Sequence, residues 1–168
     1  STLFPYTTLF RSLRQAKEDG IVIPAHCEND GVVNYLRGWY KAQGLTQPIY
    51  HARSRPARCE AEAVSRLLHL AAMAGEAPVY VVHLSSAAGL AEVRKARAQR
   101  QKGVGVETCT QYLTLTEAAY ADPQEGLKAV MSPPLRTQAD CDALWQGLQD
   151  GVIDAVATDH CPFRFAVE

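Results

Sequence analysis

The sequence lacks the features that mark several special classes of protein. It has no apolar run near the ~18 residues of a membrane-spanning helix and no recognisable signal peptide. Its 17 basic and 18 acidic residues are interspersed, so no basic face indicates a nucleic-acid or anionic-membrane partner. Its 5 cysteines are odd in number and form no CxxC pair, which favours reduced thiols in a cytoplasmic protein over a disulfide framework. The remaining composition, 47% hydrophobic and 21% charged, is that of an ordinary globular protein.

The opening segment, STLFPYTTLFRS, shows neither strand alternation nor helical periodicity. Back-translation of Leu3 to Ser12 gives codons that match a common short-read sequencing adapter. We therefore expect residues 1–12 to be a non-native, adapter-derived segment that should be set aside in reasoning about the fold. On this interpretation residues 13–168 are the native part, and native sequence ahead of Leu13 is missing.

Short apolar runs alternate with longer amphipathic runs in the rest of the chain. The strand-like runs cover residues 21–26, 78–84, 104–113 and 152–160. The helical patterns cover residues 31–44, 61–75, 87–103 and 138–151, and LTQPIYHARSRP is predicted to be a polar loop. Strands that alternate with helices predict an α/β protein with a parallel sheet. An open flavodoxin-like sheet and a (β/α) barrel both fit this alternation.

Potential metal ligands or reactive groups follow three of the strands, namely His26, His83 and Asp159. The C-terminal ends of barrel strands converge on one mouth, where active sites form, whereas an open sheet would spread these residues in a line. The pattern therefore favours the barrel. Imidazole and carboxylate groups are ligands of zinc. Each residue alone is equally compatible with a hydrogen-bonded strand end or a loop cap, so the pattern leaves a metal site and a structural role both open.

Six segments of the chain, in this order, carry a family resemblance: AHCEND, YHARSRPARCEAEAVSR, VYVVHLSSAAGLAEV, VETCTQYLTLT, MSPPLRT and DGVIDAVATDHCPF. Together they resemble the dihydropyrimidinase and hydantoinase branch of the cyclic amidohydrolases, over about residues 21–163. The resemblance implies a (β/α)8 TIM barrel, of which residues 13–168 would cover approximately strands 5 to 8. It also implies two divalent metal ions of zinc type, a small cyclic amide or ureide substrate, and a homotetramer.

The resemblance also assigns roles to individual residues. His26 and His83 match the histidines after the fifth and sixth barrel strands, which bind the second metal ion. Asp159 matches the aspartate after the eighth strand, which binds the first metal ion and transfers a proton. Ser132 matches a serine that hydrogen-bonds the substrate ring. His160 is a candidate for orienting Asp159 or closing the pocket, and a structural loop role is the alternative.

Other parts of the family pattern have no match in this chain. An HxH pair, a carboxylated lysine and an oxyanion-stabilising tyrosine are all missing. We therefore expect a half-barrel, truncated at both ends and inactive alone, whose intact parent opens dihydropyrimidine or hydantoin rings to N-carbamoyl amino acids. Dihydroorotase and allantoinase activities stay open, as does a non-catalytic dihydropyrimidinase-like scaffold. Glu60 and Glu62 are expected on the solvated face of a helix.

Overall fold

The computed structural model describes residues 6–161. Within them lie the strands β1 (Ile23–Ala25), β2 (Val79–Val81), β3 (Val104–Cys109) and β4 (Ala155–Ala157). The helices are α1 (Tyr6–Asp19), α2 (Asp30–Ala42), α3 (Pro48–Arg53), α4 (Ala57–Met73), α5 (Ala87–Ala98), α6 (Thr110–Thr114) and α7 (Gln138–Gln149), with 3-10 turns η1 (Glu117–Tyr120) and η2 (Glu125–Ala129). The predicted alternation is confirmed, although the strands are shorter than the apolar runs that predicted them.

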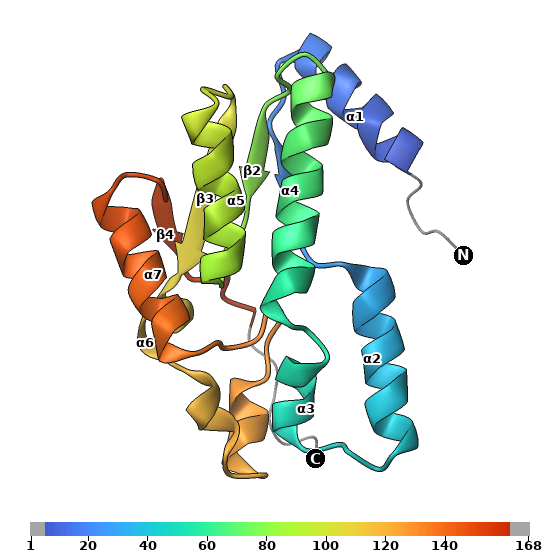
Figure 1. The fold of residues 1–168 in the computed structure, drawn as a ribbon, viewed down its shortest axis with the longest axis vertical. Coiled ribbons are helices and arrows are strands. Elements are labelled where there is room, and N and C mark those ends of the chain that lie inside the picture. Colours follow the sequence, from blue (N-terminus) through green and yellow to red (C-terminus); the bar gives the residue numbers. More distant parts are fainter. Residues whose placement is uncertain (1–5, 162–168) are drawn as a thin grey trace.

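The strands form one parallel sheet in the order β1-β2-β3-β4. Ala25 lies opposite Val81 in the register, and Cys109 lies opposite Ala157. Right-handed crossovers that always advance in one direction return along the same face of a sheet. Helices α4, α5 and α7 accordingly lie next to one another along one face (Figure 1). A flavodoxin-like sheet would reverse its strand order, so this arrangement is that of a barrel segment.

The hydrophobic core lies between the sheet and these helices. Val79, Val81 and Val106 point into it from the strands and are buried. Leu67 of α4 and Leu144 of α7 are buried against the same cluster. Each such side chain contributes about 1.5–3 kcal/mol when it is fully removed from water. This packing fixes the strands, and with them the positions at which their C-terminal ends deliver side chains.

Two segments differ from their predicted structure. The predicted polar loop contains α3, which begins at Pro48, where the missing N–H of proline is of no consequence for a helix. The predicted strand 104–113 ends at Cys109, and the chain then turns into α6. Tyr112 and Leu113 are both buried, which a helix allows. In a strand, consecutive residues would point to opposite faces of the sheet.

The opening segment also differs from its prediction. Helix α1 begins at Tyr6 rather than near Leu13, and residues 1–5 lie outside the described part. Leu9 and Phe10 pack against the core together with the buried Leu13, which follows them by four and three residues and so lies on the same helix face. Helical structure does not identify the origin of a segment. The adapter origin of residues 1–12 therefore stays a prediction.

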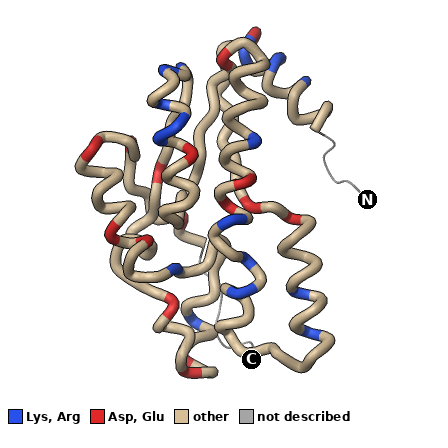
Figure 2. Tube along the Cα trace, in the orientation of Figure 1, with Lys and Arg blue, Asp and Glu red and all other residues tan. Residues whose placement is uncertain are grey.

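Charged residues of both signs are spread along the described trace rather than collected by sign (Figure 2). Surface ion pairs connect α5 with the segment around β4: Arg94 lies 2.6 Å from Asp150, and Arg97 lies 2.7 Å from Asp154. None of the helices among residues 6–161 is long and apolar enough to cross a membrane.

Candidate active site

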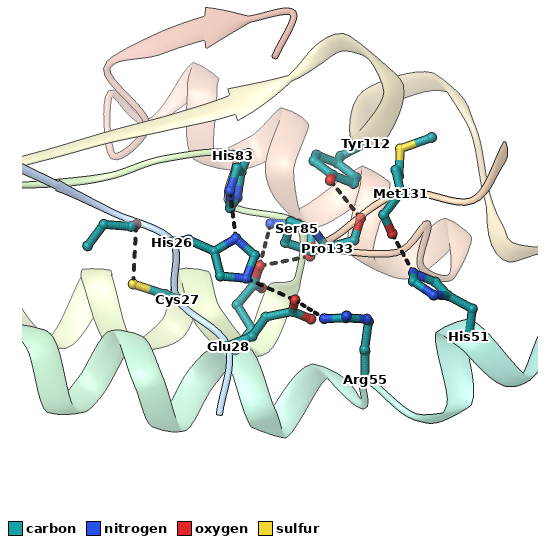
Figure 3. Close-up of polar contacts among 12 residues, drawn as sticks. His26, Cys27, Glu28, His51, Arg55, His83, Ser85, Tyr112, Met131 and Pro133 are labelled. Atoms are coloured by element: carbon teal, nitrogen blue, oxygen red, sulfur yellow. Dashed lines mark hydrogen bonds and ion pairs between the residues drawn. The ribbon is translucent and has the colours of Figure 1, made fainter. Parts of the chain in front are cut away.

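The structure brings His26 and His83 together at the C-terminal edge of the sheet. His26 follows β1 and His83 follows the neighbouring β2, so parallel pairing places both residues at the same edge. The Nδ1 atom of His26 lies 2.9 Å from the Nε2 atom of His83. The rings meet edge to face, with centroids 4.7 Å apart, as Figure 3 shows. The predicted convergence of these two histidines is therefore seen directly.

A buried carboxylate orients the second nitrogen of His26. The Nε2 atom of His26 lies 3.0 Å from Oε2 of Glu28, and Nη1 of Arg55 donates to the same oxygen at 2.6 Å (Figure 3). Burial alone would raise the pKa of Glu28, but the hydrogen bond from His26 and the charge of Arg55 lower it below its usual value. An ionised carboxylate only accepts hydrogen bonds, so the His26 proton sits on Nε2, and Nδ1 faces His83 as the unprotonated nitrogen.

The surroundings of His83 favour the neutral form of its ring. Its ring is buried, and burial together with the charge of His26 lowers its pKa, so it is a neutral imidazole near pH 7. Its backbone adopts a left-handed conformation with φ of 40°, and its Nδ1 atom is buried without a hydrogen-bond partner among the described residues. Two imidazole nitrogens that face each other, one of them backed by a carboxylate, fit the donor chemistry of a zinc site.

Asp159 lies beyond the C-terminal end of β4, two residues after Ala157. It is exposed, and its backbone also has a left-handed φ, of 47°. Its negative charge acts on the pKa values of His83 and Cys109, which places it in their neighbourhood. Among residues 6–161, no group of three or more His, Cys, Asp and Glu residues could hold a metal ion. The role of Asp159 as a third ligand and proton carrier therefore stays a prediction.

Ser132 and His160 are both exposed near this edge, and their predicted roles also stay predictions. The segment that carries Ser132 is held on both sides. The Nε2 atom of His51 lies 2.7 Å from the carbonyl oxygen of Met131, and the hydroxyl of Tyr112 donates to the carbonyl oxygen of Pro133 at 2.7 Å (Figure 3). These contacts fix the backbone around Ser132 while leaving its side chain exposed.

The prediction for Glu60 was wrong, while Glu62 is exposed as expected. Glu60 is 1% exposed and accepts hydrogen bonds from the backbone and hydroxyl of Ser85 and from the hydroxyl of Ser86. Burial raises the pKa of Glu60, although Arg136 and the serine hydrogen bonds oppose this. The sequence did contain a signal: Glu60 precedes three buried apolar residues of the same helix face, at positions 63, 64 and 67.

The chain has relatives among both curated proteins and solved structures. No family model matches it. The chain is 50% identical over 158 residues to a D-phenylhydantoinase of Escherichia coli O1:K1, which covers 94% of this chain and 34% of that protein. Among solved structures, dihydropyrimidinase from Brevibacillus agri superimposes with a TM-score of 0.91 at 44% identity, over 95% of this chain and 34% of that one. L-hydantoinase from Arthrobacter aurescens superimposes with a TM-score of 0.83 at 30% identity, over 94% of this chain and 34% of that one.

The chain therefore spans about a third of the length of the relatives it matches. Its parallel sheet, with strands in chain order and helices on one face, is the matching part of their TIM-barrel fold. The expected resemblance is confirmed by both kinds of comparison. Over 94% of its length this chain matches the dihydropyrimidinase and hydantoinase branch of the cyclic amidohydrolases.

Proposed function

We propose that this chain forms part of a metal-dependent hydrolase that opens cyclic amides, with dihydropyrimidines or hydantoins as substrates and N-carbamoyl amino acids as products. The observation that carries the proposal is the 2.9 Å approach of His26 Nδ1 to His83 Nε2 at the C-terminal edge of a barrel sheet. The likeness to D-phenylhydantoinase over 94% of the chain supports the choice of substrate class.

The proposed cofactors are two zinc ions, with His26 and His83 holding one and Asp159 contributing to the other. When bound, zinc supplies Lewis acidity, which polarises a carbonyl group and lowers the pKa of water. Glu28 supports this by keeping the proton of His26 on Nε2, so that the unprotonated Nδ1 can act as a metal ligand. The low pKa of His83 serves the same end, because only a neutral imidazole nitrogen can act as a ligand.

The remaining chemistry belongs to Asp159 and Ser132. Asp159 takes a proton from the attacking water and delivers it to the ring nitrogen as the amide C–N bond breaks, so it acts first as general base and then as general acid. Ser132 hydrogen-bonds the ring and holds the scissile carbonyl in place. The reaction consumes one water molecule and leaves a carboxylate and a ureido group. His160 orients Asp159 from the adjacent position.

We also propose that the protein is cytoplasmic and that it forms a homotetramer. A cytoplasmic location is supported by four buried cysteines that are free thiols, Cys27, Cys59, Cys109 and Cys141. A homotetramer is the assembly that the family resemblance implies. The chain by itself is proposed to be inactive, because the predicted HxH pair, carboxylated lysine and oxyanion tyrosine have no counterpart in its sequence.

A segment exchange tests the function. This chain would replace the matching third of Escherichia coli D-phenylhydantoinase, to which it is 50% identical. We expect the chimera to bind zinc and to open phenylhydantoin, and we expect His83→Ala to lower both zinc content and turnover. His69→Ala is the matched control, since His69 is exposed on α4, and it should change neither quantity. A folded chimera whose His83→Ala variant keeps full zinc content and turnover would contradict the proposal.

The same chimera decides between the related substrates. Turnover of dihydrouracil or hydantoin, measured beside dihydroorotate and allantoin, separates the proposed activity from the two alternatives. The unfused chain should show no turnover of any of the four. Hydrolysis by the chain alone would show that the sites expected from other parts of the barrel are dispensable.

A further inference from the structure

A buried carboxylate lies directly beneath the loop that carries His83. Oε1 of Glu60 accepts from the backbone N–H of Ser85 at 2.9 Å and from its hydroxyl at 2.8 Å, while Oε2 accepts from the hydroxyl of Ser86. Ser86 is also the N-cap of α5 and accepts from the N–H of Gly89 at 3.0 Å. A Cβ atom at Gly89 would lie 2.8 Å from Oε2 of Glu60, so glycine is needed for the carboxylate to come this close.

Burying the polar carboxyl group of Glu60 costs free energy, and packing alone does not require it. An apolar residue of similar size at such a position is often equally or more stabilising. The cost is offset here by the serine donors, by the N-terminal end of α5 and by the nearby Arg136. A group held at such cost is best explained by the geometry that it imposes on its donors.

Glu60 belongs to a chain of polar contacts that reaches both histidines. The Nε atom of Arg136 donates to the hydroxyl of Ser85 at 3.2 Å, and its Nη1 atom donates to the carbonyl oxygen of Arg55. The side chain of Arg55 in turn contacts Glu28, which contacts His26 (Figure 3). The loop after β1 and the loop after β2 are therefore connected through one network of buried groups.

The conformation of His83 shows why its loop needs such support. A φ of 40° lies in the left-handed region that non-glycine residues rarely adopt, and it persists only when the surroundings of the residue impose it. The backbone is held on the C-terminal side of His83 by the N–H of Leu84, which donates to the carbonyl oxygen of Glu107 at 2.8 Å, and by the Ser85 N–H bond to Glu60. Of these two anchors, only Glu60 also connects to the loop of His26.

We propose that Glu60 is a positioning residue, which holds the Ser85–Ser86 turn so that Nε2 of His83 faces Nδ1 of His26. With Arg136 it couples the orientations of the two histidines, and it touches neither metal nor substrate. The consequence for metal affinity rests on the proposed function. The consequence for the geometry of His83 does not, because it concerns only contacts within this chain.

The test compares Glu60→Gln with Glu92→Gln in the full 168-residue chain. Glu92 is the matched control, because its carboxylate pairs with Lys95 three residues further along α5. In Glu60→Gln we expect the Ser85 amide to exchange its hydrogen about tenfold faster. We also expect the side-chain nitrogen resonances of His83 and His26 to shift in NMR spectra of the folded protein. Zinc affinity, measured by competitive titration, should fall ~10–100-fold. The control should change none of these.

The readouts separate positioning from simple stability. A residue that only stabilised the fold would lower the free energy of unfolding while leaving the histidine resonances of the folded state unchanged, and that result would overturn the proposal. If Glu60→Gln does not fold, Ser85→Ala replaces it, because it removes one donor to Glu60 and the acceptor of Arg136. Unchanged histidine resonances in Ser85→Ala would then overturn the proposal. If the wild-type chain binds no zinc but the resonances shift, the positioning role stands and the metal site fails.

Discussion

Replacing Arg55 with methionine removes the cation that faces the buried carboxylate of Glu28. The two side chains are 14% and 2% exposed, and Nη1 of Arg55 lies 2.6 Å from Oε2 of Glu28. Removing one partner of a buried ion pair typically costs 3–5 kcal/mol, because the other charge stays buried without compensation. Glu28 keeps its hydrogen bond with His26. We therefore expect Arg55→Met to lower the free energy of unfolding by about 3 kcal/mol, at the lower end of this range.

A surface pair of the same length provides the control. Nη2 of Arg94 lies 2.6 Å from Oδ2 of Asp150, but these side chains are 39% and 37% exposed. Exposed pairs contribute about 0–1 kcal/mol, so Arg94→Met should lower the free energy of unfolding by no more than about 1 kcal/mol. Urea unfolding, followed by circular dichroism at pH 7, measures both variants under the same conditions.

A double variant separates the lost attraction from the cost of the remaining charge. Glu28→Gln together with Arg55→Met leaves no unpaired ion, so the double variant should be more stable than Arg55→Met alone. The reasoning would be refuted if Arg55→Met and Arg94→Met lowered the free energy of unfolding equally. It would also be refuted if the effects of Glu28→Gln and Arg55→Met simply added.

Two further perturbations follow from the same structure. Burial lowers the pKa of His51, so between its folded pKa and the ordinary value of about 6.5 the unfolded chain binds more protons and stability falls as the pH falls. His51→Gln keeps a donor for Met131 but does not titrate, so urea midpoints measured from pH 7 to pH 5 should depend less on pH, and an unchanged dependence would contradict this assignment. A Cβ atom at Gly105 would overlap the ring of Tyr80, so Gly105→Ala should lower the free energy of unfolding by about 1–3 kcal/mol. Gly38→Ala, with open space around it in α2, should instead raise that free energy by about 0.5–1 kcal/mol in the same unfolding assay, and equal effects of the two substitutions would argue against a steric origin.

Local patterns predicted the elements well wherever neighbouring residues decide the structure. Apolar runs predicted all four strands, since a buried strand needs continuous apolar side chains. Periodicity failed where burial of a short segment depends on distant partners. Residues 110–114 look like a continuation of β3, but they form a helix that buries Tyr112 against the segment of Pro133. Residues 6–12 showed no clear helical periodicity in the sequence, yet they form the first part of α1, because Leu9 and Phe10 pack against the core.

For the candidate site, the sequence by itself determined which groups stand at the C-terminal strand ends, because strand direction and side-chain identity are local properties. His26, His83 and Asp159 could be selected in this way, and the ordered motifs identified the family. Only the tertiary structure decided which groups are buried beside them. Glu28 and Glu60 are acidic residues that composition alone would place in water. They are buried because Arg55, Arg136 and Ser85 reach them from remote parts of the chain, and a carboxylate leaves water only where such donors replace its hydration.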